Sequence, residues 1–574
     1  MPIDRIRTIS RFLILLLLGC VCLALPAFAA DRAEVLFSLG PESFDEMPLH
    51  AVAVQQVNYK YYLFLPGGAD AGDAQIWFSD AETVTLGQET LHSGDRTHAL
   101  IPGETIRLVW KRKKMDVRVR QGSPIPAVFV SSASGTMKKI DRTKRHEETG
   151  WARVLDQQGK IVCDGELSRL RIRGNTSGKF KKKSYYLKFT EKVDLFGMGK
   201  AKKWTLIGNS RDHSLIRNQL LFAMADYVGL PYSAQCLQAD VYLNHFYNGI
   251  YLLQEKVEIG KNRIAITDLA KETESANGQP LESYPIKGAR KLKKGEFKYT
   301  EIPRDPEDIT GGYLLEYENW QVRYKDEDSA YTTKRGKVIL VKEPERASQA
   351  QMEYISSFIQ GYEDAIFAED GRDPKSGKRY DEFVDLDSLA LKYILEEYSK
   401  NCDANASSQF YYKPADSEST VAFAGPPWDY DTSFGVFARS NEEELIDPEG
   451  LYAGARTGSD YWWPKLVEQP EFRARVSELW RERYVPAIRT ALGEETDERG
   501  LLLSVRGYAD IMRASAEMNF ELWPIKQGGG GNIVNTGATF EENLDYLEDF
   551  MRKRYEYLEK EWAQPASADS ANRP

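Results

Sequence analysis

Three aspartates stand in one stretch of the chain, and their types and spacing suggest phosphoryl-transfer chemistry. Asp403 lies in a polar loop, and an aromatic, strand-like run and a Gly-Pro turn follow it. Asp429 and Asp431 come next, in the segment WDYD. The segment between Asp403 and Asp429 is long enough to form a hairpin that brings its two ends together. A loop acid that orients a hydroxyl, facing a second acid that holds Mg²⁺, is an arrangement that phosphotransferases use.

The same acids favour magnesium over zinc. Carboxylate oxygens, water and phosphate are the ligands that Mg²⁺ prefers. The six histidines are scattered without a pair at i and i+4, so neither a zinc site nor a Ser-His-Asp arrangement is supported. Asp429 and Asp431 alternate along a segment expected to be extended, which predicts side chains on opposite faces. Only one of them is then a primary metal ligand, unless the chain bends. The structural alternative for Asp403 is an acid at a helix exit with no catalytic role.

Three further clusters are candidates for nucleotide binding. A turn rich in glycine and hydroxyl groups lies between two predicted strands, where its N–H groups and a lysine on the second strand suit phosphate. The turn and the lysine consist of Arg173, Gly174, Asn175, Thr176 and Lys188. Arg217 and Asn218 begin a predicted helix, whose first N–H groups also face outward. Glu255 ends a predicted strand whose backbone suits hydrogen bonding to an adenine. The structural alternatives are a polar hairpin, a helix cap and an ordinary strand end.

The chain divides into regions of different periodicity. Residues 30–122 contain short alternating runs separated by turn residues, which predicts an all-β, sandwich-like accessory domain. Residues 123–345 predict a twisted antiparallel sheet with one helix, at 214–229, packed on it, as in an α+β lobe. Residues 346–563 have helical periodicity and predict a helical lobe. Residues 564–574 are expected to be a disordered tail.

Composition and the N-terminus indicate an exported protein. A length of 574 residues predicts more than one domain, and the net charge of −10 argues against binding a nucleic-acid polymer. Residues 1–29 have a basic start, a short apolar run and an Ala27-Phe28-Ala29 site, which predicts a secretory signal peptide. We therefore expect a periplasmic, cell-surface or secreted protein with no transmembrane segment after signal removal. The surroundings of Cys20 weakly resemble a lipoprotein cleavage site, but Cys20 lies inside the apolar run, which argues against lipid anchoring.

Three cysteines remain after the signal peptide is removed. Cys163, Cys236 and Cys402 are an odd set, so at most one intramolecular disulfide is expected. Cys402 lies beside Asp403, but a cysteine nucleophile needs a base, and none is recognisable nearby. The favoured interpretation of Cys402 is a small buried residue.

The motifs follow one another in a recognisable order. They are RIRGN, KKKSYYLKF, KKWTLIGNSRDHSLIRN, VYLN…YNGIYLLQEKVEI, GGYLLE, KNCDA…SSQFYYK and GPPWDYDTSFG, and they span about residues 125–480. In this order they resemble the CotH family, the spore-coat-protein-H-like atypical protein kinases. The resemblance implies a two-lobed, protein-kinase-like α+β fold and transfer of the ATP γ-phosphoryl group to Ser or Thr. It also implies ATP and Mg²⁺ as cofactors and a protein substrate rich in Ser and Thr.

The resemblance assigns roles to the acids. Asp403 takes the place of the catalytic acid that orients the acceptor hydroxyl. Asp429 takes the place of the magnesium ligand, with Asp431 as second choice. Gln409 or Ser408 stands where ordinary kinases have a second metal-holding Asn, but neither is as good a ligand as a carboxylate.

The resemblance also assigns roles around the nucleotide. Lys188 takes the place of a phosphate contact, and the turn from Arg173 to Thr176 would cover the phosphates. Arg217 and Asn218 stand where ordinary kinases have a helix glutamate. The family turn usually has the sequence RGNST followed by an aromatic residue, whereas this chain has RGNTSG.

Two other functions remain open. The exported location and the N-terminal β domain favour a non-catalytic surface or envelope interaction protein that uses the kinase-like fold as a scaffold. Transfer of AMP by the same site is a further alternative, because a fold alone does not determine its chemistry. Export raises the question of nucleotide supply, since ATP is scarce outside the cytoplasm.

Overall fold

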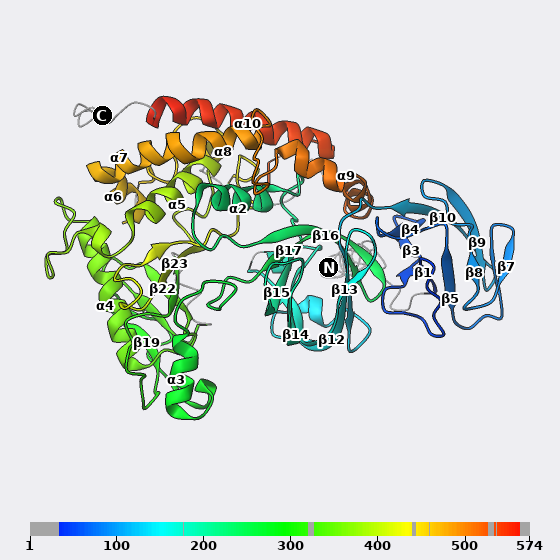
Figure 1. The fold of residues 1–574 in the computed structure, drawn as a ribbon, viewed down its shortest axis with the longest axis horizontal. Coiled ribbons are helices and arrows are strands. Elements are labelled where there is room, and N and C mark those ends of the chain that lie inside the picture. Colours follow the sequence, from blue (N-terminus) through cyan, green and yellow to red (C-terminus); the bar gives the residue numbers. More distant parts are fainter. Residues whose placement is uncertain are drawn as a thin grey trace, which may run out of the picture.

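The computed structural model describes residues 34–175, 177–318, 327–438, 443–457, 460–525, 533–534 and 536–562. The predicted signal peptide, Thr176 and the predicted tail 564–574 lie outside the described residues. The fold is mixed α+β, as predicted. Two N-terminal sheets lie at one end of the molecule, a barrel lies in the middle, and a third sheet with most of the helices lies at the other end (Figure 1).

The N-terminal strands form two sheets that share one core. Their orders are β2-β1-β5-β8 and β3-β4-β10-β9-β6-β7. The strands are β1 (Val35–Leu39), β2 (Val52–Ala53), β3 (Gln55–Val57), β4 (Lys60–Leu65), β5 (Ala74–Phe78), β6 (Val84–Leu86), β7 (Glu89–Leu91), β8 (Arg96–Thr97), β9 (Thr105–Trp110) and β10 (Lys113–Gln121). Ile76 of the first sheet and Leu63 of the second belong to the same buried cluster, together with Phe129 and Tyr242 of the barrel. The apolar core therefore continues from the N-terminal sheets to the outside of the barrel.

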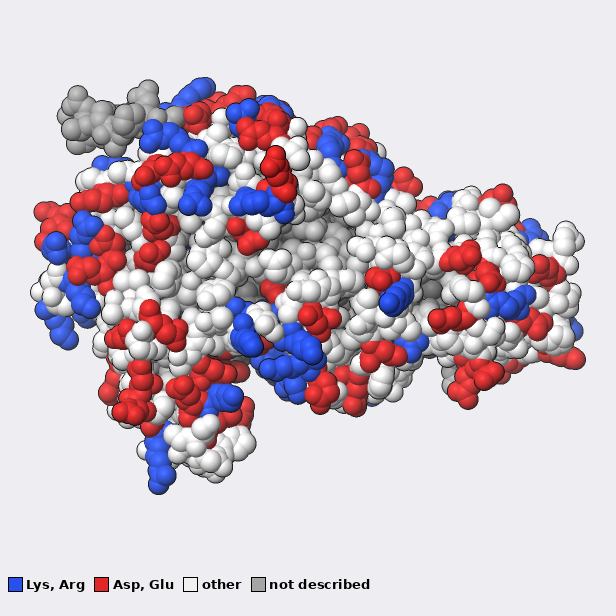
Figure 2. Space-filling model, viewed as in Figure 1, with Lys and Arg blue, Asp and Glu red and all other residues white. Residues whose placement is uncertain are grey.

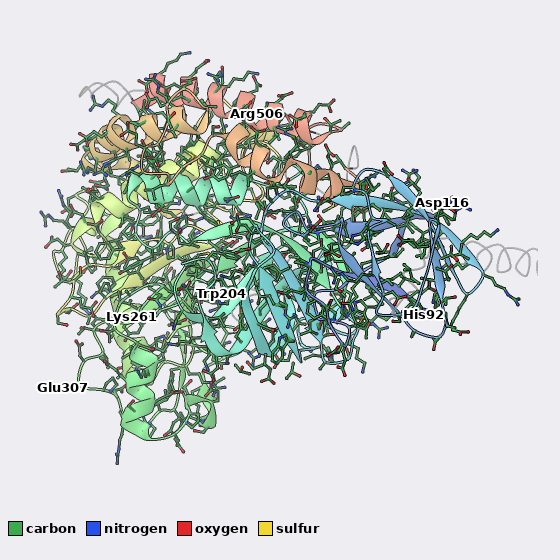
Figure 3. All side chains as sticks on the ribbon, turned by 45° about the vertical axis from the view of Figure 1, so that its right-hand side comes forward. His92, Asp116, Trp204, Lys261, Glu307 and Arg506 are labelled. Atoms are coloured by element: carbon green, nitrogen blue, oxygen red, sulfur yellow. The ribbon has the colours of Figure 1, made fainter. Side chains whose placement is uncertain are left out.

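The next strands close into a barrel, whereas we expected a twisted antiparallel sheet and did not predict its closure. The order is β11-β12-β13-β14-β15-β17-β16, and β11 pairs in parallel with β16. The strands are β11 (Ala127–Ser132), β12 (Glu148–Leu155), β13 (Ile161–Arg173), β14 (Ser184–Val193), β15 (Ala201–Ile207), β16 (Cys236–Leu243) and β17 (Phe246–Glu255). Closure buries Val130 of β11 and Val241 of β16 in the barrel core, where Trp204 is fully buried (Figure 3). It also removes two sheet edges whose backbone groups would otherwise be unpaired.

Helix α2 (Arg217–Val228) joins the barrel to the helical part of the molecule. It begins three residues later than the predicted start at 214, and the Asp212 carboxylate accepts a hydrogen bond from the Arg217 backbone N–H at 2.8 Å. It ends at Gly229, whose φ of 86° suits glycine at a helix end. Leu220 and its apolar neighbours share a core with Leu252 on β17 and with the C-terminal helices. The helix therefore packs between the two parts of the molecule, not on a sheet alone.

The third sheet crosses the lobe boundary that we expected at residue 345. Its order is β18-β19-β21-β22-β20-β23-β24. The strands are β18 (Ile286–Lys287), β19 (Phe297–Thr300), β20 (Tyr313–Glu318), β21 (Ala330–Thr332), β22 (Val338–Glu343), β23 (Gln409–Lys413) and β24 (Phe423–Ala424). Because β20 pairs with both β22 and β23, a boundary at 345 divides one sheet.

Helices make up most of the rest of this part of the molecule. They are α3 (Leu269–Asn277), α4 (Gln349–Ile366), α5 (Leu386–Ser399), α6 (Trp462–Glu468), α7 (Pro470–Leu479), α8 (Val485–Ala491), α9 (Val505–Leu522) and α10 (Phe540–Trp562). One of them, α9, bonds to barrel residues Asp240 and Ile250 through Ser515 and Asn519.

A capping box formed by Ser348 and Gln351 begins α4. Asp385 caps α5, which is buried at every position from Ser388 to Ser399. None of the helices in the described part of the chain is both long and apolar enough to cross a membrane.

Among the described residues, the three cysteines form no disulfide with one another. Cys163 and Cys402 are buried, and Cys236 is half-buried. The Cys402 sulfur lies 3.1 Å from the Thr432 hydroxyl, which joins the loop after α5 to the loop after β24. Cys402 thus occupies a packed, polar contact inside the protein.

His50 lies where the N-terminal sheets meet the barrel. Its ring packs against Phe44 and against Phe129 of β11, with ring centroids 5.4 and 6.2 Å away. Arg153 of β12 donates a hydrogen bond to its Nδ1 at 2.9 Å, so the imidazole is neutral in this arrangement. Burial, followed by the Arg153 charge, lowers the pKa of His50 from 6.5 to about 4.

This pKa predicts that the protein loses stability below neutral pH. Between pH 6.5 and pH 4 the unfolded chain binds a proton at His50 and the folded chain excludes it. We expect the free energy of unfolding to fall by about 1 kcal/mol between pH 7.5 and 5.5 on account of His50. Urea unfolding of the wild type and of His50→Gln at both pH values measures this contribution. An identical pH dependence of the two proteins would contradict the prediction.

Candidate active site

A cleft of about 410 Å³ brings the three predicted acids together with the predicted glycine turn. Asp403, Asp429 and Asp431 all line it, as do Arg173, Gly174 and Asn175. The turn follows barrel strand β13, whereas the acids follow α5 and β24. The cleft therefore lies between the barrel and the part of the molecule that contains the third sheet and the helices.

A hairpin joins the two acid-bearing loops, as we predicted. Strands β23 and β24 are antiparallel, with Tyr411 opposite Ala424 and Tyr412 opposite Phe423. The loop that contains Asp403 precedes β23, and the segment that contains Asp429 follows β24. The short ladder thus returns the chain to the cleft.

The prediction that Asp429 and Asp431 point to opposite faces is wrong. Asp429 has a φ of 66°, in the left-handed region, so the segment bends there and does not continue as a strand. Aspartate is one of the few residues other than glycine that adopts this conformation at modest cost. The bend directs both carboxylates to the same cleft.

The buried carboxylate of Glu396 on α5 links the two acid-bearing loops. It accepts hydrogen bonds from the Tyr430 hydroxyl at 2.6 Å and from the Asn401 side-chain amide at 2.9 Å, and it pairs with the Lys392 ammonium. Tyr430 lies between Asp429 and Asp431, and the Asn401 side-chain oxygen accepts a hydrogen bond from the Asp403 backbone N–H at 3.1 Å. One buried anion therefore sets the position of the loop acid relative to the other two.

The loop around Asp403 is also held from outside α5. The helix is followed by Lys400, which caps its C-terminal end with a φ of 45°. The Lys400 ammonium donates a hydrogen bond to the Glu444 carbonyl at 2.9 Å. The Trp463 indole N–H donates to the Ala404 carbonyl at 2.9 Å. These bonds restrict the movement of the loop. The Asp403 side chain on this loop is half-buried and lines the cleft.

Arg217 and Asn218 bond the segment that contains Asp429 and Asp431, and neither residue lines the cleft. Both side chains are buried. Arg217 pairs with Asp212 at 2.5 Å, and its Nε donates to the Ser433 carbonyl at 2.9 Å. The Asn218 side-chain oxygen accepts a hydrogen bond from the Tyr430 backbone N–H at 2.7 Å. The structure gives these residues a positioning role in place of the nucleotide contact that we expected.

Lys188 lies near the cleft but not among its lining residues. Strand alternation puts it on the same face of β14 as Ser184 and Tyr186, which do line the cleft. Lys188 is one step further along the strand, in register with Arg169 on β13 and Lys203 on β15. Lys and Arg side chains gather over the region of β14 and β15 (Figure 2). Arg169, Lys188 and Lys203 therefore form a basic row across the three strands beside the cleft.

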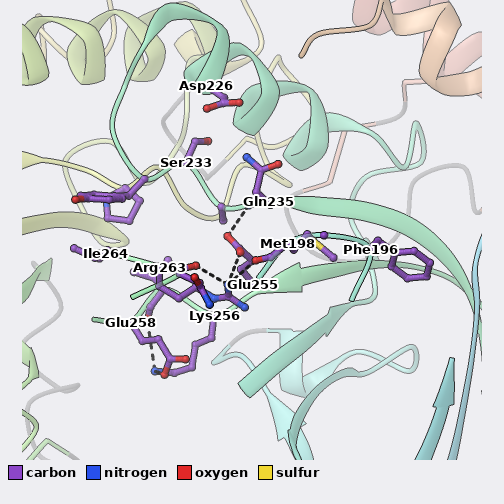
Figure 4. Close-up of a pocket in the computed structure, with 16 residues that line it drawn as sticks. Phe196, Met198, Asp226, Ser233, Gln235, Glu255, Lys256, Glu258, Arg263 and Ile264 are labelled. Carbon is purple, nitrogen blue, oxygen red and sulfur yellow. Dashed lines mark hydrogen bonds and ion pairs between the residues drawn. The ribbon is translucent and has the colours of Figure 1, made fainter. Parts of the chain in front are cut away.

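Glu255 lines a second cavity, of about 370 Å³, at the end of the barrel strands (Figure 4). Its carboxylate pairs with Arg263 at 2.5 Å and accepts a hydrogen bond from the Gln235 backbone N–H at 2.9 Å. Burial raises the pKa of Glu255 to about 7, although Arg263 acts in the opposite direction. The two cavities share Lys256 and Val257, so the chain just beyond Glu255 separates them.

Of the two candidates for a second metal ligand, Ser408 lines the cleft and Gln409 does not. Gln409 is buried at the start of β23. Its side-chain amide donates to the Ser407 carbonyl at 3.4 Å. Gln409 thus supports the Asp403 loop.

Sequence analysis missed several residues of the cleft. Arg211 and Trp428 were inside quoted motifs, but no role was assigned to either. Lys256 and Lys342 also line the cleft and had no distinguishing spacing. The Arg173 guanidinium stacks on the Trp428 ring at 5.2 Å, which joins the glycine turn to the acid-bearing loop. An aromatic residue next to the acids and an arginine in the turn are the signals that could have indicated this contact.

The acids fit a divalent cation. Burial, followed by the neighbouring Asp429 carboxylate, raises the pKa of Asp431 to about 8. Such crowding of carboxylates is relieved when a cation binds between them. Among the described residues no group of three or more His, Cys, Asp or Glu side chains is arranged to hold a metal. Mg²⁺ needs only one or two carboxylates when phosphate oxygens and water complete its shell, so Asp429 and Asp431 suit it.

One family comparison covers all of the cleft-lining residues except Lys144. The model of a family described as CotH kinase protein matches residues 170–558. The match includes the glycine turn, α2, the Asp403 loop and the WDYD segment. No curated protein matches the chain.

The Glu396 contacts predict a large loss of stability when this carboxylate is removed. Glu396→Leu leaves the buried Lys392 ammonium without its anion and leaves Tyr430 and Asn401 without their acceptor. We expect the free energy of unfolding, measured with urea, to fall by about 3–5 kcal/mol.

Two variants control this measurement. Glu556→Leu replaces an exposed glutamate of α10 and is expected to change stability by less than about 0.5 kcal/mol. The double variant Lys392→Met/Glu396→Leu is expected to regain part of the lost stability, because no lone charge remains buried. Equal effects of Glu396→Leu and Glu556→Leu would show that the carboxylate is not a structural centre.

Proposed function

The chain belongs to the CotH kinase family, and from this premise we propose that it is a Mg²⁺-dependent protein kinase. It transfers the γ-phosphoryl group of ATP to a serine or threonine hydroxyl of a protein. The observation that carries the proposal is that Asp403, Asp429 and Asp431 line one cleft together with the Arg173–Asn175 turn. Kinase chemistry needs this combination of an acceptor-side acid, metal-side acids and a phosphate-covering turn.

The proposed fold is kinase-like and two-lobed. The barrel forms one lobe, the third sheet with helices α4 to α10 forms the other, and α2 packs between them. The cleft lies between these two parts, and residues from both line it. Closure of the barrel leaves this arrangement intact, because the cleft-lining residues of β13, β14 and β15 alternate with those of the barrel core.

Asp403 acts on the acceptor hydroxyl. Its carboxylate accepts a hydrogen bond from the acceptor hydroxyl, orients the oxygen toward the γ-phosphorus and takes the proton as the new bond forms. The hydrogen bond from the Asp403 backbone to Asn401 and the Glu396 contact behind it keep the carboxylate in place. A fixed position is what lets a single acid orient an incoming hydroxyl.

The turn, the nearby cations and the two acids beyond the hairpin would bind the nucleotide and its metal. Backbone N–H groups of the turn and the cations Arg171, Arg173 and Lys256 line the cleft and suit the negative phosphates. Asp429 and Asp431 would hold Mg²⁺, which when bound neutralises phosphate oxygens. The Arg173–Trp428 stack keeps the turn close to these acids.

We further propose that the protein acts after export, on a Ser- and Thr-rich protein partner. The support for export is the basic start, the apolar run and the Ala27-Phe28-Ala29 site. The net charge of −10 supports a protein partner over a nucleic-acid polymer.

The Asp403 assignment predicts a selective loss of turnover. With [γ-³²P]ATP, Mg²⁺ and dephosphorylated casein as a Ser/Thr-rich acceptor, wild type is expected to label the casein. Asp403→Ala is expected to lower kcat by about 10²–10⁴ while it keeps the circular dichroism spectrum and the affinity for Mg-ATP. Asp370→Ala, at an exposed turn, is the matched control and is expected to keep full activity.

Each contrary result has a distinct meaning. Equal labelling by Asp403→Ala would remove Asp403 from the catalytic role. No labelling together with no binding of Mg-ATP in calorimetry would support the non-catalytic scaffold. A product whose mass increases by AMP, not by phosphate, would support AMP transfer by the same site.

A further inference from the structure

Arg211 lies in the cleft with its guanidinium clamped between two aromatic rings. It belongs to the segment between β15 and α2 and lines the same cleft as Asp403 and Asp431. Its guanidinium lies 5.0 Å from the centre of the Phe180 ring and 4.9 Å from that of Phe437. Cation–π contact with both rings restricts the side chain, and the planar guanidinium carries N–H edges that can bind an anion.

One polar edge of this arginine has no partner inside the described part of the protein. Its Nε is buried and has no hydrogen-bond partner among the described residues. Asp431 attracts the guanidinium electrostatically. Arg217, six residues later, differs because its Nε and Nη1 bond the Ser433 carbonyl, Asp212 and Ser214, although its Nη2 also has no partner among the described residues. A clamped cation with an unsatisfied edge at a cleft suits a bound anion.

The backbone under Arg211 is anchored. The next residue, Asp212, is buried and accepts hydrogen bonds from the backbone N–H groups of Ser214 and Arg217 at 3.0 and 2.8 Å. The two rings come from opposite walls: Phe180 follows the glycine turn, and Phe437 follows the acid-bearing loop. Arg211 is therefore held where the turn and the acids approach each other.

We propose that Arg211 is a further catalytic residue, which binds the phosphoryl group during its transfer. This inference rests on the proposed kinase function and adds a residue to its site. As the bond between the γ-phosphorus and the β–γ bridging oxygen breaks, the electron pair leaves with ADP. A bond from the acceptor oxygen forms at the same phosphorus, and the hydroxyl proton passes to Asp403. Arg211 donates N–H hydrogen bonds to the equatorial phosphoryl oxygens, where negative charge is concentrated.

A simpler role for Arg211 is to balance the charge of Asp431. The two roles predict different effects of the substitution Arg211→Lys. Charge balance requires only a cation, so Arg211→Lys would retain it. Phosphoryl binding uses the planar, two-pronged guanidinium edge, which a lysine lacks.

The test uses the full-length protein and a mimic of the transferring phosphoryl group. Calorimetry measures the affinity for Mg-ADP with and without aluminium fluoride. In wild type we expect aluminium fluoride to tighten Mg-ADP binding by about 100-fold or more, and in Arg211→Ala and Arg211→Lys we expect most of this gain to vanish. Mg-ADP alone is expected to bind within about fivefold of wild type. In turnover with casein, kcat falls by about 10²–10³, and added guanidinium partly restores Arg211→Ala.

Arg335 supplies the matched control. It stacks on Phe367 at 4.1 Å and also has a buried, unpartnered Nε, but it is not among the cleft-lining residues. Arg335→Ala is expected to keep the aluminium fluoride gain and the wild-type kcat. This variant separates loss of a stacked arginine in general from loss of the one in the cleft.

The outcomes separate the inference from the proposed function. A full aluminium fluoride gain in Arg211→Lys, or an unchanged kcat in Arg211→Ala, overturns the phosphoryl role while the kinase proposal stands. The same holds if wild type binds Mg-ADP but gains nothing from aluminium fluoride. If wild type neither binds Mg-ADP nor transfers phosphate, the proposed function fails, and the inference fails with it.

Discussion

The buried carboxylate of Glu396 is the interaction on which the candidate site depends. A charge inside a protein is stable only when its surroundings satisfy it, and here Lys392, Tyr430 and Asn401 do so. Tyr430 stands between Asp429 and Asp431, Asn401 stands two residues before Asp403, and Lys392 lies on the same helix as Glu396. The need to satisfy one anion therefore fixes the distance between the Asp403 loop and the two acids beyond the hairpin. The adjacent Glu397 pairs with Arg554 at 2.6 Å, which ties the same helix to α10.

Contacts from the barrel side complete this scaffold. Arg173 stacks on Trp428, Arg217 bonds the Ser433 carbonyl, and Asn218 bonds the Tyr430 backbone. These contacts reach the acid-bearing loop from the turn and from α2, so both parts of the molecule position the same few residues. The left-handed conformation of Asp429 costs free energy, and a dense set of hydrogen bonds around the bend is what maintains it. The aromatic clamp on Arg211 adds a cation to the same small volume.

Local patterns in the sequence predicted the helices, the hairpin and the three acids, because these depend on nearby residues. The barrel was not predictable in this way, since the parallel pairing of β11 with β16 joins segments far apart in the chain. The direction of Asp431 depends on one backbone angle at Asp429, which no alternation rule contains. Arg217 was expected at the nucleotide because helix starts commonly bind phosphate, but its burial against Asp212 directs it inward. The order of the motifs indicated the family, and the family match confirms this resemblance.

The most direct test of the account is a crystal structure with Mg²⁺ and a non-hydrolysable ATP analogue. We predict Mg²⁺ with oxygens of Asp429 or Asp431, or of both, at about 2.1 Å, together with phosphate oxygens. We also predict the terminal phosphate between the Arg173–Asn175 turn and Asp403. A nucleotide bound outside this cleft, or a metal bound without Asp429 and Asp431, would contradict the account.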